Sequence, residues 1–121
     1  MKFKYCIQEH HATRLHWDLR LEHKGKAKSW AVPKRPVFKK GEKRLAVQVA
    51  DHKLSYMKFK GIIPEGQYGA GTVKIWDSGY YVPEKITAKE WVIEIHGKKL
   101  KGKFVLVNFK DKNWLFFKKK L

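Results

Sequence analysis

The sequence contains 121 residues, of which 28 are Lys or Arg and 11 are Asp or Glu, so its formal net charge is +17. A chain of this length fits a single domain with a hydrophobic core, here residues 1–121, and is too short for two such domains. No apolar run is long enough for a membrane helix, and no signal-peptide segment opens the chain. The lone Cys6 allows no internal disulfide, so we expect a cytoplasmic protein with no membrane partner.

In chain order, alternating apolar and polar residues predict eight short strands separated by polar or glycine-containing turns. They cover residues 3–7, 15–22, 27–32, 44–50, 72–76, 91–96, 104–109 and 114–118. Between them we expect a short helical or irregular segment at 54–59, a glycine-rich loop at 61–71, a turn at 77–79 and a helical turn at 83–89. Many short strands without an amphipathic helix indicate an all-β, mainly antiparallel barrel or sandwich, with short helical turns and long loops.

The excess of positive charge favours a polyanionic partner, nucleic acid above all. Aromatic residues make up 14% of the chain and offer surfaces on which bases can stack. Composition alone leaves open whether such a protein binds nucleic acid or cuts it.

The predicted strand at 15–22 carries a row of polar side chains on one face. Side chains alternate with period 2 along a strand, so His16, Asp18 and Arg20 share a face opposite the apolar residues. We place His10 in a loop just upstream, from which it can join the row only if the loop folds back. Two imidazoles and a carboxylate suit Mn, Fe or Zn and leave coordination positions open. The candidate ligands are therefore His10, His16 and Asp18. The competing interpretation is a polar strand face with exposed histidines.

Other residues are candidates for handling a phosphate. His52, between Asp51 and Lys53 at a strand end, is a candidate general acid or phosphate donor, because imidazole titrates near neutral pH. Arginine and lysine side chains that could clamp a phosphate are Arg20, Lys34 and Arg44. The glycine-rich segment at 66–71 lacks the ending of a P-loop and precedes a strand, so we interpret it as a tight turn beside the site.

Four segments in order are similar to the signatures of one family, the 3′-phosphoesterase domain of bacterial and archaeal DNA ligase D, which also occurs as a free-standing protein. They read QEHHATRLHWDLRLE, SWAVPK, RLAVQVADHKLSY and GIIPEGQYGAGTVKIWD. The resemblance runs from about Phe3 to Asp77, and the ending KGKFVLVNFKDKNWLFFKKK is similar too. Motifs this long and in this order are highly specific.

The resemblance implies a compact β-barrel whose concave face holds Mn²⁺, for which Co²⁺ or Zn²⁺ could substitute. It implies repair of 3′ ends during end joining, on DNA or DNA–RNA primer-templates, with a separate ligase and polymerase of the end-joining system as candidate partners. In such enzymes a 3′-terminal ribonucleotide is removed to leave a 3′-phosphate, which is then hydrolysed to a 3′-hydroxyl.

The resemblance also assigns roles to residues of this chain. The implied metal ligands are His10, His16 and Asp18. The implied catalytic and phosphate-contacting residues are Arg20, His52 and Tyr56, with supporting contacts from Gln8, Lys34 and Arg44.

The sequence departs from the family pattern in two places. It begins at the first predicted strand, whereas many ligase-linked members carry an N-terminal arm that contributes charged residues to the site. It has Ala50 where such members often have a glutamate before the Asp-His pair. Either difference is expected to weaken the phosphomonoesterase step most.

Two other classes of function remain as alternatives. A non-catalytic, basic nucleic-acid-binding barrel explains the charge and predicts that removal of metal changes nothing. A two-histidine, one-carboxylate Fe(II) oxygenase would use His16 and Asp18 with a distant His52 or His96, and it leaves the charge of +17 unexplained.

Overall fold

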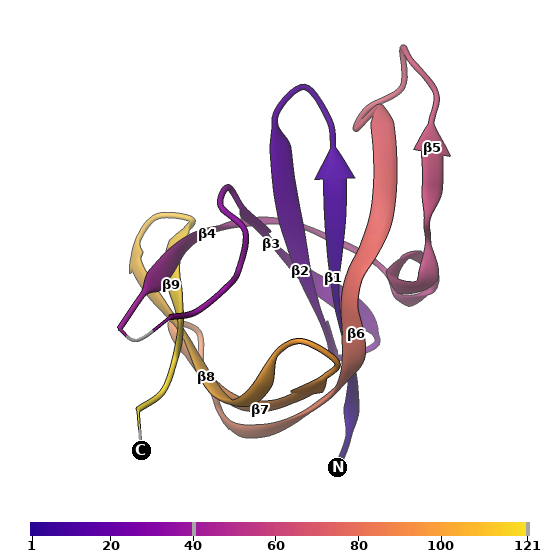
Figure 1. Ribbon diagram of the computed structural model, residues 1–121. Coiled ribbons are helices and arrows are strands. Elements are labelled where there is room, and N and C mark those ends of the chain that lie inside the picture. The colour runs from indigo at the N-terminus through magenta and orange to yellow at the C-terminus, as the bar shows by residue number, and fades with distance from the viewer. Residues whose placement is uncertain (40, 121) are drawn as a thin grey trace.

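The computed structural model describes residues 1–39 and 41–120. Within them the chain forms a sheet of nine strands and one short 3₁₀ helix (Figure 1). The elements are β1 (Phe3–His11), β2 (Leu15–His23), β3 (Lys26–Val32), β4 (Lys43–Lys53), η1 (Leu54–Lys58), β5 (Gly61–Ile63), β6 (Gly71–Ile86), β7 (Glu90–Gly97), β8 (Lys101–Lys110) and β9 (Asn113–Lys118). No helix in this described part of the chain is long and apolar enough to cross a membrane.

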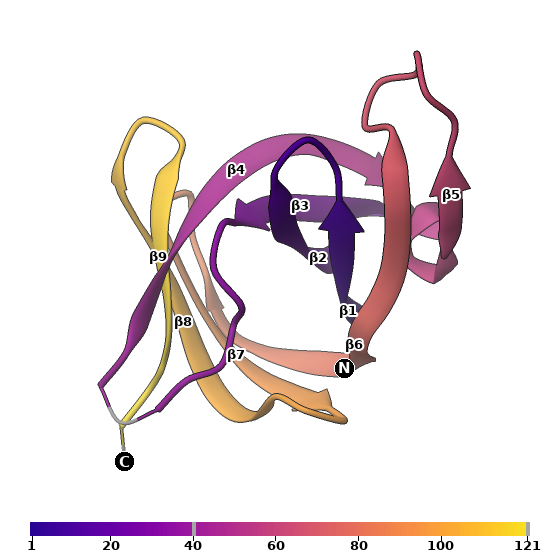
Figure 2. The ribbon, with the colours of Figure 1, turned by 45° about the horizontal axis from the view of Figure 1, so that its top comes forward.

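The strands close into an antiparallel barrel. Their order is β1-β2-β3-β4-β9-β8-β7-β6-β5, and an additional pairing of β1 with β6 joins the two sides of the sheet. β5 pairs with β6 and stays outside the ring, next to η1 (Figure 2). The structure therefore confirms the all-β, antiparallel prediction and decides for a barrel over a sandwich.

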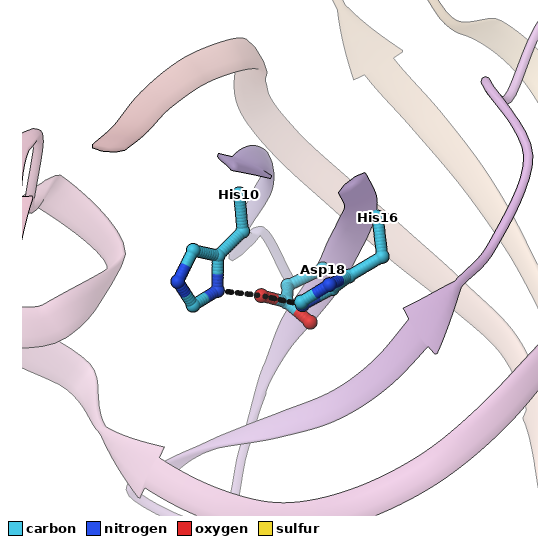
Figure 3. Close-up of side chains that lie close together, drawn as sticks. All are labelled: His10, His16 and Asp18. Atoms are coloured by element: carbon cyan, nitrogen blue, oxygen red, sulfur yellow. Dashed lines mark hydrogen bonds and ion pairs between the residues drawn. The ribbon is translucent and has the colours of Figure 1, made fainter. Parts of the chain in front are cut away.

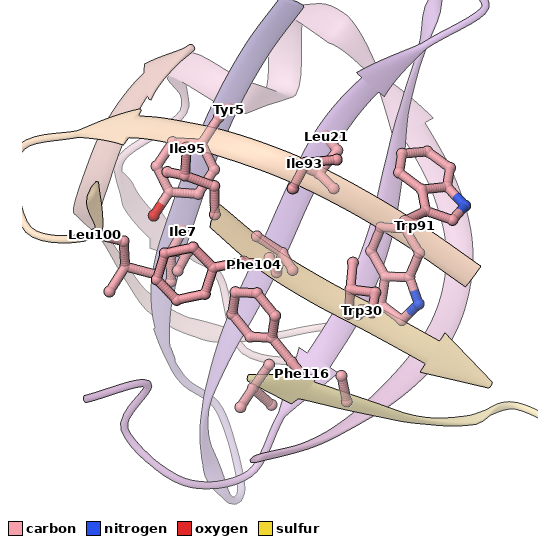
Figure 4. Packing of buried hydrophobic residues seen from close by; sticks show 14 of the residues in the cluster. Tyr5, Ile7, Leu21, Trp30, Trp91, Ile93, Ile95, Leu100, Phe104 and Phe116 are labelled. Atoms are coloured by element: carbon pink, nitrogen blue, oxygen red, sulfur yellow. The ribbon is translucent and has the colours of Figure 1, made fainter. Parts of the chain in front are cut away.

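The barrel interior is filled with aromatic and branched aliphatic side chains (Figure 4). Trp30 lies at its centre, fully buried, with edge-to-face contacts to Trp91 and Trp114 at ring-centroid distances of 5.4 and 5.7 Å. Phe104 and Phe116 pack in the same core. Because this interior is occupied by apolar side chains, polar chemistry must take place on another surface.

That surface is the outer face of the wall formed by β1, β2 and β3. Side chains such as Ile7 and Leu19 point into the core, so by period 2 their strand neighbours point outward. Gln8, His10, Asp18, Arg20 and Ser29 occupy this outer face and are nevertheless buried. The cover comes from η1 and the segment after β5, which pack over the wall.

Four local expectations were wrong. β1 continues to His11 instead of ending at residue 7, because β2 and β6 pair with its second half on both sides. β6 runs through the predicted turn at 77–79 and into the predicted helical turn at 83–89, since β1 and β7 supply hydrogen-bonding partners there. Residues 61–63 of the predicted loop form β5, whereas the short helical segment expected after residue 53 is η1.

Candidate metal and phosphate site

Two histidines and an aspartate meet on the outer face of the β1–β2 hairpin (Figure 3). His10 lies directly opposite His16 in the register of the two strands, and Asp18 follows two residues later. The Oδ2 atom of Asp18 is 3.5 Å from Nδ1 of His10 and 3.2 Å from Nε2 of His16. One ligand atom from each of the three lies within 4.8 Å of the others. His10 therefore reaches the group from a strand, and the prediction of a loop that folds back was wrong.

Backbone carbonyls orient both imidazoles. Nε2–H of His10 donates to the carbonyl oxygen of Gly69 at 2.6 Å, and Nδ1–H of His16 donates to that of Arg14 at 3.0 Å. In the neutral imidazoles the lone pairs then lie on the opposite nitrogens, which are the two that face Asp18. Two lone pairs and a carboxylate directed at one another repel unless a cation lies between them. The donor set and its outer hydrogen bonds therefore fit a divalent transition metal.

Protonation of His16 would compete with a metal for the same lone pair. The hydrogen bond to Asp18 raises the pKa of His16, and this effect outweighs the burial that lowers it. Burial raises the pKa of Asp18, but the hydrogen bond from His16 and the charge of Arg20 together bring that pKa below its usual range. Both shifts favour a protonated His16 beside an ionised Asp18, with the proton on the nitrogen whose lone pair a metal would use.

Arg20 lies next to the group formed by His10, His16 and Asp18, and several side chains fix its position. Its side chain is buried, and Nη2 lies 3.5 Å from Oδ2 of Asp18. Nη1 donates to Oγ of Ser29 at 2.7 Å and to Nδ1 of His52 at 3.2 Å. The guanidinium also lies over the ring of Tyr56, with 4.9 Å between Cζ and the ring centroid. These contacts fix a positive charge beside the metal-ligand group, where an anion would bind.

Gln8 is fully buried beneath Arg20. Its Oε1 accepts a hydrogen bond from Nε of Arg20, and its Nε2 donates to the carbonyl oxygens of Tyr56 at 2.8 Å and Phe59 at 3.1 Å. One amide thus ties the arginine to η1. The family resemblance implied a supporting polar contact from Gln8, and in the structure its Oε1 contacts Arg20.

His52 completes the row at the end of β4. Arg20 can only donate, so its hydrogen bond to Nδ1 of His52 uses the neutral tautomer with the proton on Nε2. The carbonyl oxygen of Ala50, also 3.2 Å from Nδ1, would accept from the tautomer with the proton on Nδ1. Burial, followed by the charge of Arg20, lowers the pKa of His52 and favours the neutral imidazole. The ring centroids of His52 and Tyr56 lie 4.9 Å apart. Burial raises the pKa of the Tyr56 phenol. Ala50 is exposed, with its carbonyl oxygen 3.2 Å from Nδ1 of His52.

Lys34 and Arg44 occupy a different place. They line a separate surface groove with Pro33, Lys43 and Leu45, and Lys34 is exposed. The guanidinium of Arg44 donates to the backbone carbonyls of residues 35 and 37 and pairs with Glu42 at 2.8 Å. Its contacts therefore hold residues 35, 37 and 42 to β4.

The histidines invoked for an oxygenase are placed differently from the metal-ligand group. His96, on β7, pairs with Glu94 at 2.7 Å and stacks on Tyr80. His52 contacts Arg20, so the third member of the His16 and Asp18 group is His10.

Sequence reasoning missed the backbone carbonyls of Arg14 and Gly69, and it missed Ser29. The glycine-rich composition of residues 66–71 was the only signal for Gly69, and it pointed to a turn without showing which side chain the turn would contact.

Comparison with known proteins shows which family the chain is similar to. Residues 8–108 match the family described as DNA Ligase D 3′-phosphoesterase domain. The chain is 46% identical over 123 residues to the multifunctional non-homologous end joining protein LigD of Mycolicibacterium smegmatis, covering 93% of this chain and 16% of that protein. It is 44% identical to the protein of the same name from Pseudomonas aeruginosa, covering 97% and 15%, and 44% identical to the LigD of Mycobacterium tuberculosis, covering 92% and 15%. The chain thus spans about one sixth of the length of these relatives.

Proposed function

The chain belongs to the DNA ligase D 3′-phosphoesterase domain family, and on that premise we propose that it is a metal-dependent phosphoesterase that heals DNA 3′ ends for end joining. In the first reaction it removes a 3′-terminal ribonucleoside by hydrolysing a phosphodiester, and in the second it hydrolyses the remaining 3′-phosphate to a 3′-hydroxyl. The observation that carries the proposal is the convergence of two oriented imidazole lone pairs on Asp18 beside the buried Arg20.

His10, His16 and Asp18 would hold the metal. Mn²⁺ is the ion we expect, and Co²⁺ and Zn²⁺ suit the same donors. When bound, the ion supplies Lewis-acid polarisation of a phosphate oxygen and lowers the pKa of bound water.

Arg20 and His52 would bind the phosphate of the substrate. Both present N–H groups from fixed positions, Arg20 through its contacts with Gln8 and Ser29, and His52 through the hydrogen bond from Arg20. Preorganised donors of this kind stabilise the negative charge that develops on the phosphoryl oxygens. The Nε2 proton of a neutral His52 is also available to the leaving oxygen.

The basic surface would hold the rest of the substrate. A net charge of +17 favours contact with the phosphates of a DNA or DNA–RNA primer-template, so binding should weaken steeply with salt. A separate ligase and polymerase would complete the repair of the end. Ala50, in place of a glutamate, adds no carboxylate next to His52, and we expect the phosphomonoesterase step to be the slower of the two.

The test uses a labelled primer with one 3′-terminal ribonucleotide, annealed to a longer template, with and without Mn²⁺. We expect metal-dependent shortening to a 3′-phosphate and then to a 3′-hydroxyl. D18A should abolish both steps and metal binding together. E84A is the matched control, because Glu84 is an exposed carboxylate on β6 that pairs with Lys103.

Two results would contradict the proposal. Cleavage that continues after chelation of the metal, or either activity in D18A, would contradict the hypothesis that one metal site serves both reactions. Salt-sensitive binding without cleavage would favour the second candidate, a non-catalytic nucleic-acid-binding barrel, which the charge of +17 supports.

A further inference from the structure

A cavity of about 380 Å³ opens beside the phosphate site, between η1 and the segment that follows β5. Its volume lies within the range of small-molecule sites, ~300–1,000 Å³. The residues that line it are His52, Tyr56, Phe59, Ile62, Ile63, Pro64, Gln67 and Tyr68.

Both ends of this cavity touch the candidate catalytic groups. At one end, His52 contacts Arg20 through its Nδ1 atom, and Tyr56 lies under the guanidinium of the same arginine. At the other end, Tyr68 precedes Gly69, whose carbonyl oxygen accepts the hydrogen bond from His10. A group that fills the cavity would therefore lie next to a phosphate bound by Arg20 and His52.

The cavity offers flat and apolar surfaces. The rings of Tyr56 and Phe59 stack on one another, with centroids 5.2 Å apart and planes 14° apart. At the opening, Ile62 is 75% exposed and Tyr68 is fully exposed. Large apolar side chains left in water beside a cavity indicate a binding surface, and aromatic side chains are the platforms on which nucleobases stack.

The charge on the two sides of β5 differs. The cavity lining contains no lysine, arginine or carboxylate. A second groove lies nearby and is basic, because Lys58, Lys60 and Lys74 line it together with Gly61, Val73 and Ile75. The basic groove suits the polyanionic primer or template strand, whereas the apolar cavity suits an uncharged group.

We propose that the cavity is the subsite for the terminal ribonucleoside that leaves in the phosphodiesterase step. This inference rests on the proposed function. The scissile phosphate joins two unlike parts, a charged primer strand and a single terminal nucleoside that carries no phosphate of its own. The terminal nucleoside is the uncharged part, and its base would stack against Tyr68 and the Tyr56–Phe59 pair.

The balanced reaction shows why this subsite affects one step only. Water adds to the phosphorus, the bond from phosphorus to the nucleoside 5′-oxygen breaks, and the 5′-oxygen takes up a proton while the water gives one up. The products are a primer 3′-phosphate and a free nucleoside. The second reaction starts from the 3′-phosphate, so nothing remains to occupy the cavity.

The experiment compares two primers of the same sequence, one ending in a ribonucleotide and one ending in a 3′-phosphate. Y68A should lower kcat/KM on the first primer by roughly 5- to 100-fold, as expected for the loss of one stacked base. I62A should lower it as well, because Ile62 lines the apolar opening of the cavity. Both variants should hydrolyse the 3′-phosphate at the wild-type rate, which also shows that they are folded. Y68F retains the ring and should retain the rate. F109A is the matched control, because Phe109 is a 56% exposed aromatic residue on β8.

A third primer, ending in an abasic ribose, tests the contact with the base. Wild-type protein should cleave it more slowly by at least the factor that Y68A loses, because the base also contacts the Tyr56–Phe59 pair, and Y68A should cleave it no more slowly than wild-type protein does. An equal loss on the ribonucleotide and 3′-phosphate primers would overturn the subsite, because Tyr68 would then act through the loop that orients His10. Unchanged rates on both would overturn it too. Wild-type protein that cleaves neither primer would instead refute the proposed function and the subsite with it.

Discussion

The carbonyl oxygen of Gly69 accepts a 2.6 Å hydrogen bond from Nε2 of His10, across 59 residues of sequence. This contact determines which nitrogen of His10 faces Asp18, and it ties the loop before β6 to β1. Gly69 has a φ of +77°, and a Cβ atom at this position would lie 3.4 Å from Cε1 of His10. The positive φ favours glycine here, and a Cβ atom would lie at the short end of van der Waals contact with the imidazole.

We therefore predict that G69A weakens metal binding by about 10- to 100-fold, the usual cost of disturbing an outer hydrogen bond of a metal ligand. The measurement is a calorimetric titration with Mn²⁺. G66A is the matched control, since Gly66 has a φ of +86° in the same loop and a Cβ atom there would meet nothing within 4 Å. Equal losses in the two variants would show that backbone strain, and not the contact with His10, is responsible.

Strand periodicity was sufficient to predict part of the site. His16, Asp18 and Arg20 alternate with Trp17 and Leu19, and in the structure the two sets lie on opposite faces of β2. This inference succeeds because period 2 is a property of the strand itself and needs no knowledge of its neighbours.

Contacts between strands could not be predicted in this way. His10 belongs to the group because β1 pairs with β2 in a register that places it opposite His16, and register depends on the whole hairpin. β4 gives a second example, in which the small Ala46 faces the core while Leu45 and Val49 are exposed. Alternation defines two faces, but packing against β9 and the core decides which of them points inward.

Gln8 provides a test of how Arg20 is positioned. Q8M removes the acceptor of Arg20 Nε and the two hydrogen bonds to the backbone of Tyr56 in η1 and of Phe59 just after it, with little change in volume. Each buried group left unpaired costs about 1–3 kcal/mol, so we expect lower stability and a clear loss of kcat/KM on both substrates. Metal affinity should stay near the wild-type value, because the side-chain hydrogen bonds of Gln8 go to Arg20 and to the backbone of Tyr56 and Phe59, and its pairing with Asp18 across the strands is made by the backbone.

The control is Q48M. Gln48 accepts a 3.2 Å hydrogen bond from Trp114 on the core side of β4, so its loss should lower stability and leave activity unchanged. Activity that follows stability equally in Q8M and Q48M would mean that Gln8 has no positioning role.

Asp77 provides a test of what holds the barrel together away from the site. Its buried carboxylate accepts hydrogen bonds from the backbone N–H groups of Lys98, Lys99 and Leu100 and from the hydroxyl of Tyr5, at 2.8–3.0 Å. Burial and the neighbouring carboxylate raise the pKa of Tyr5, so its hydroxyl remains a donor. D77A would leave all four donors without this acceptor, and we expect it to lower the free energy of unfolding by at least about 3 kcal/mol.

Urea denaturation measures this loss. Y5F removes only one of the four donors and should cost about 1–2 kcal/mol, a smaller effect than that of D77A. A cost below about 1 kcal/mol for D77A would show that water replaces the carboxylate and that the turn between β7 and β8 does not depend on it.

The last prediction concerns pH and metal binding. The hydrogen bond to Asp18 raises the pKa of His16 above its ordinary 6.5, so the metal-free folded protein holds this proton more tightly than the unfolded chain does. The resulting stabilisation is complete below the unfolded pKa and is lost as the pH rises through the raised folded pKa. Metal binding has the opposite dependence, because the metal needs the lone pair that this proton occupies.

The increase in Tm on addition of Mn²⁺ should therefore grow as the pH rises from about 6 to about 8, across the range in which histidine titrates. Thermal denaturation at fixed Mn²⁺ measures it, and H96Q, which changes an exposed histidine paired with Glu94, should keep the wild-type profile. If the effect of Mn²⁺ on Tm stayed constant or shrank over this range, metal and proton would not be competing for His16.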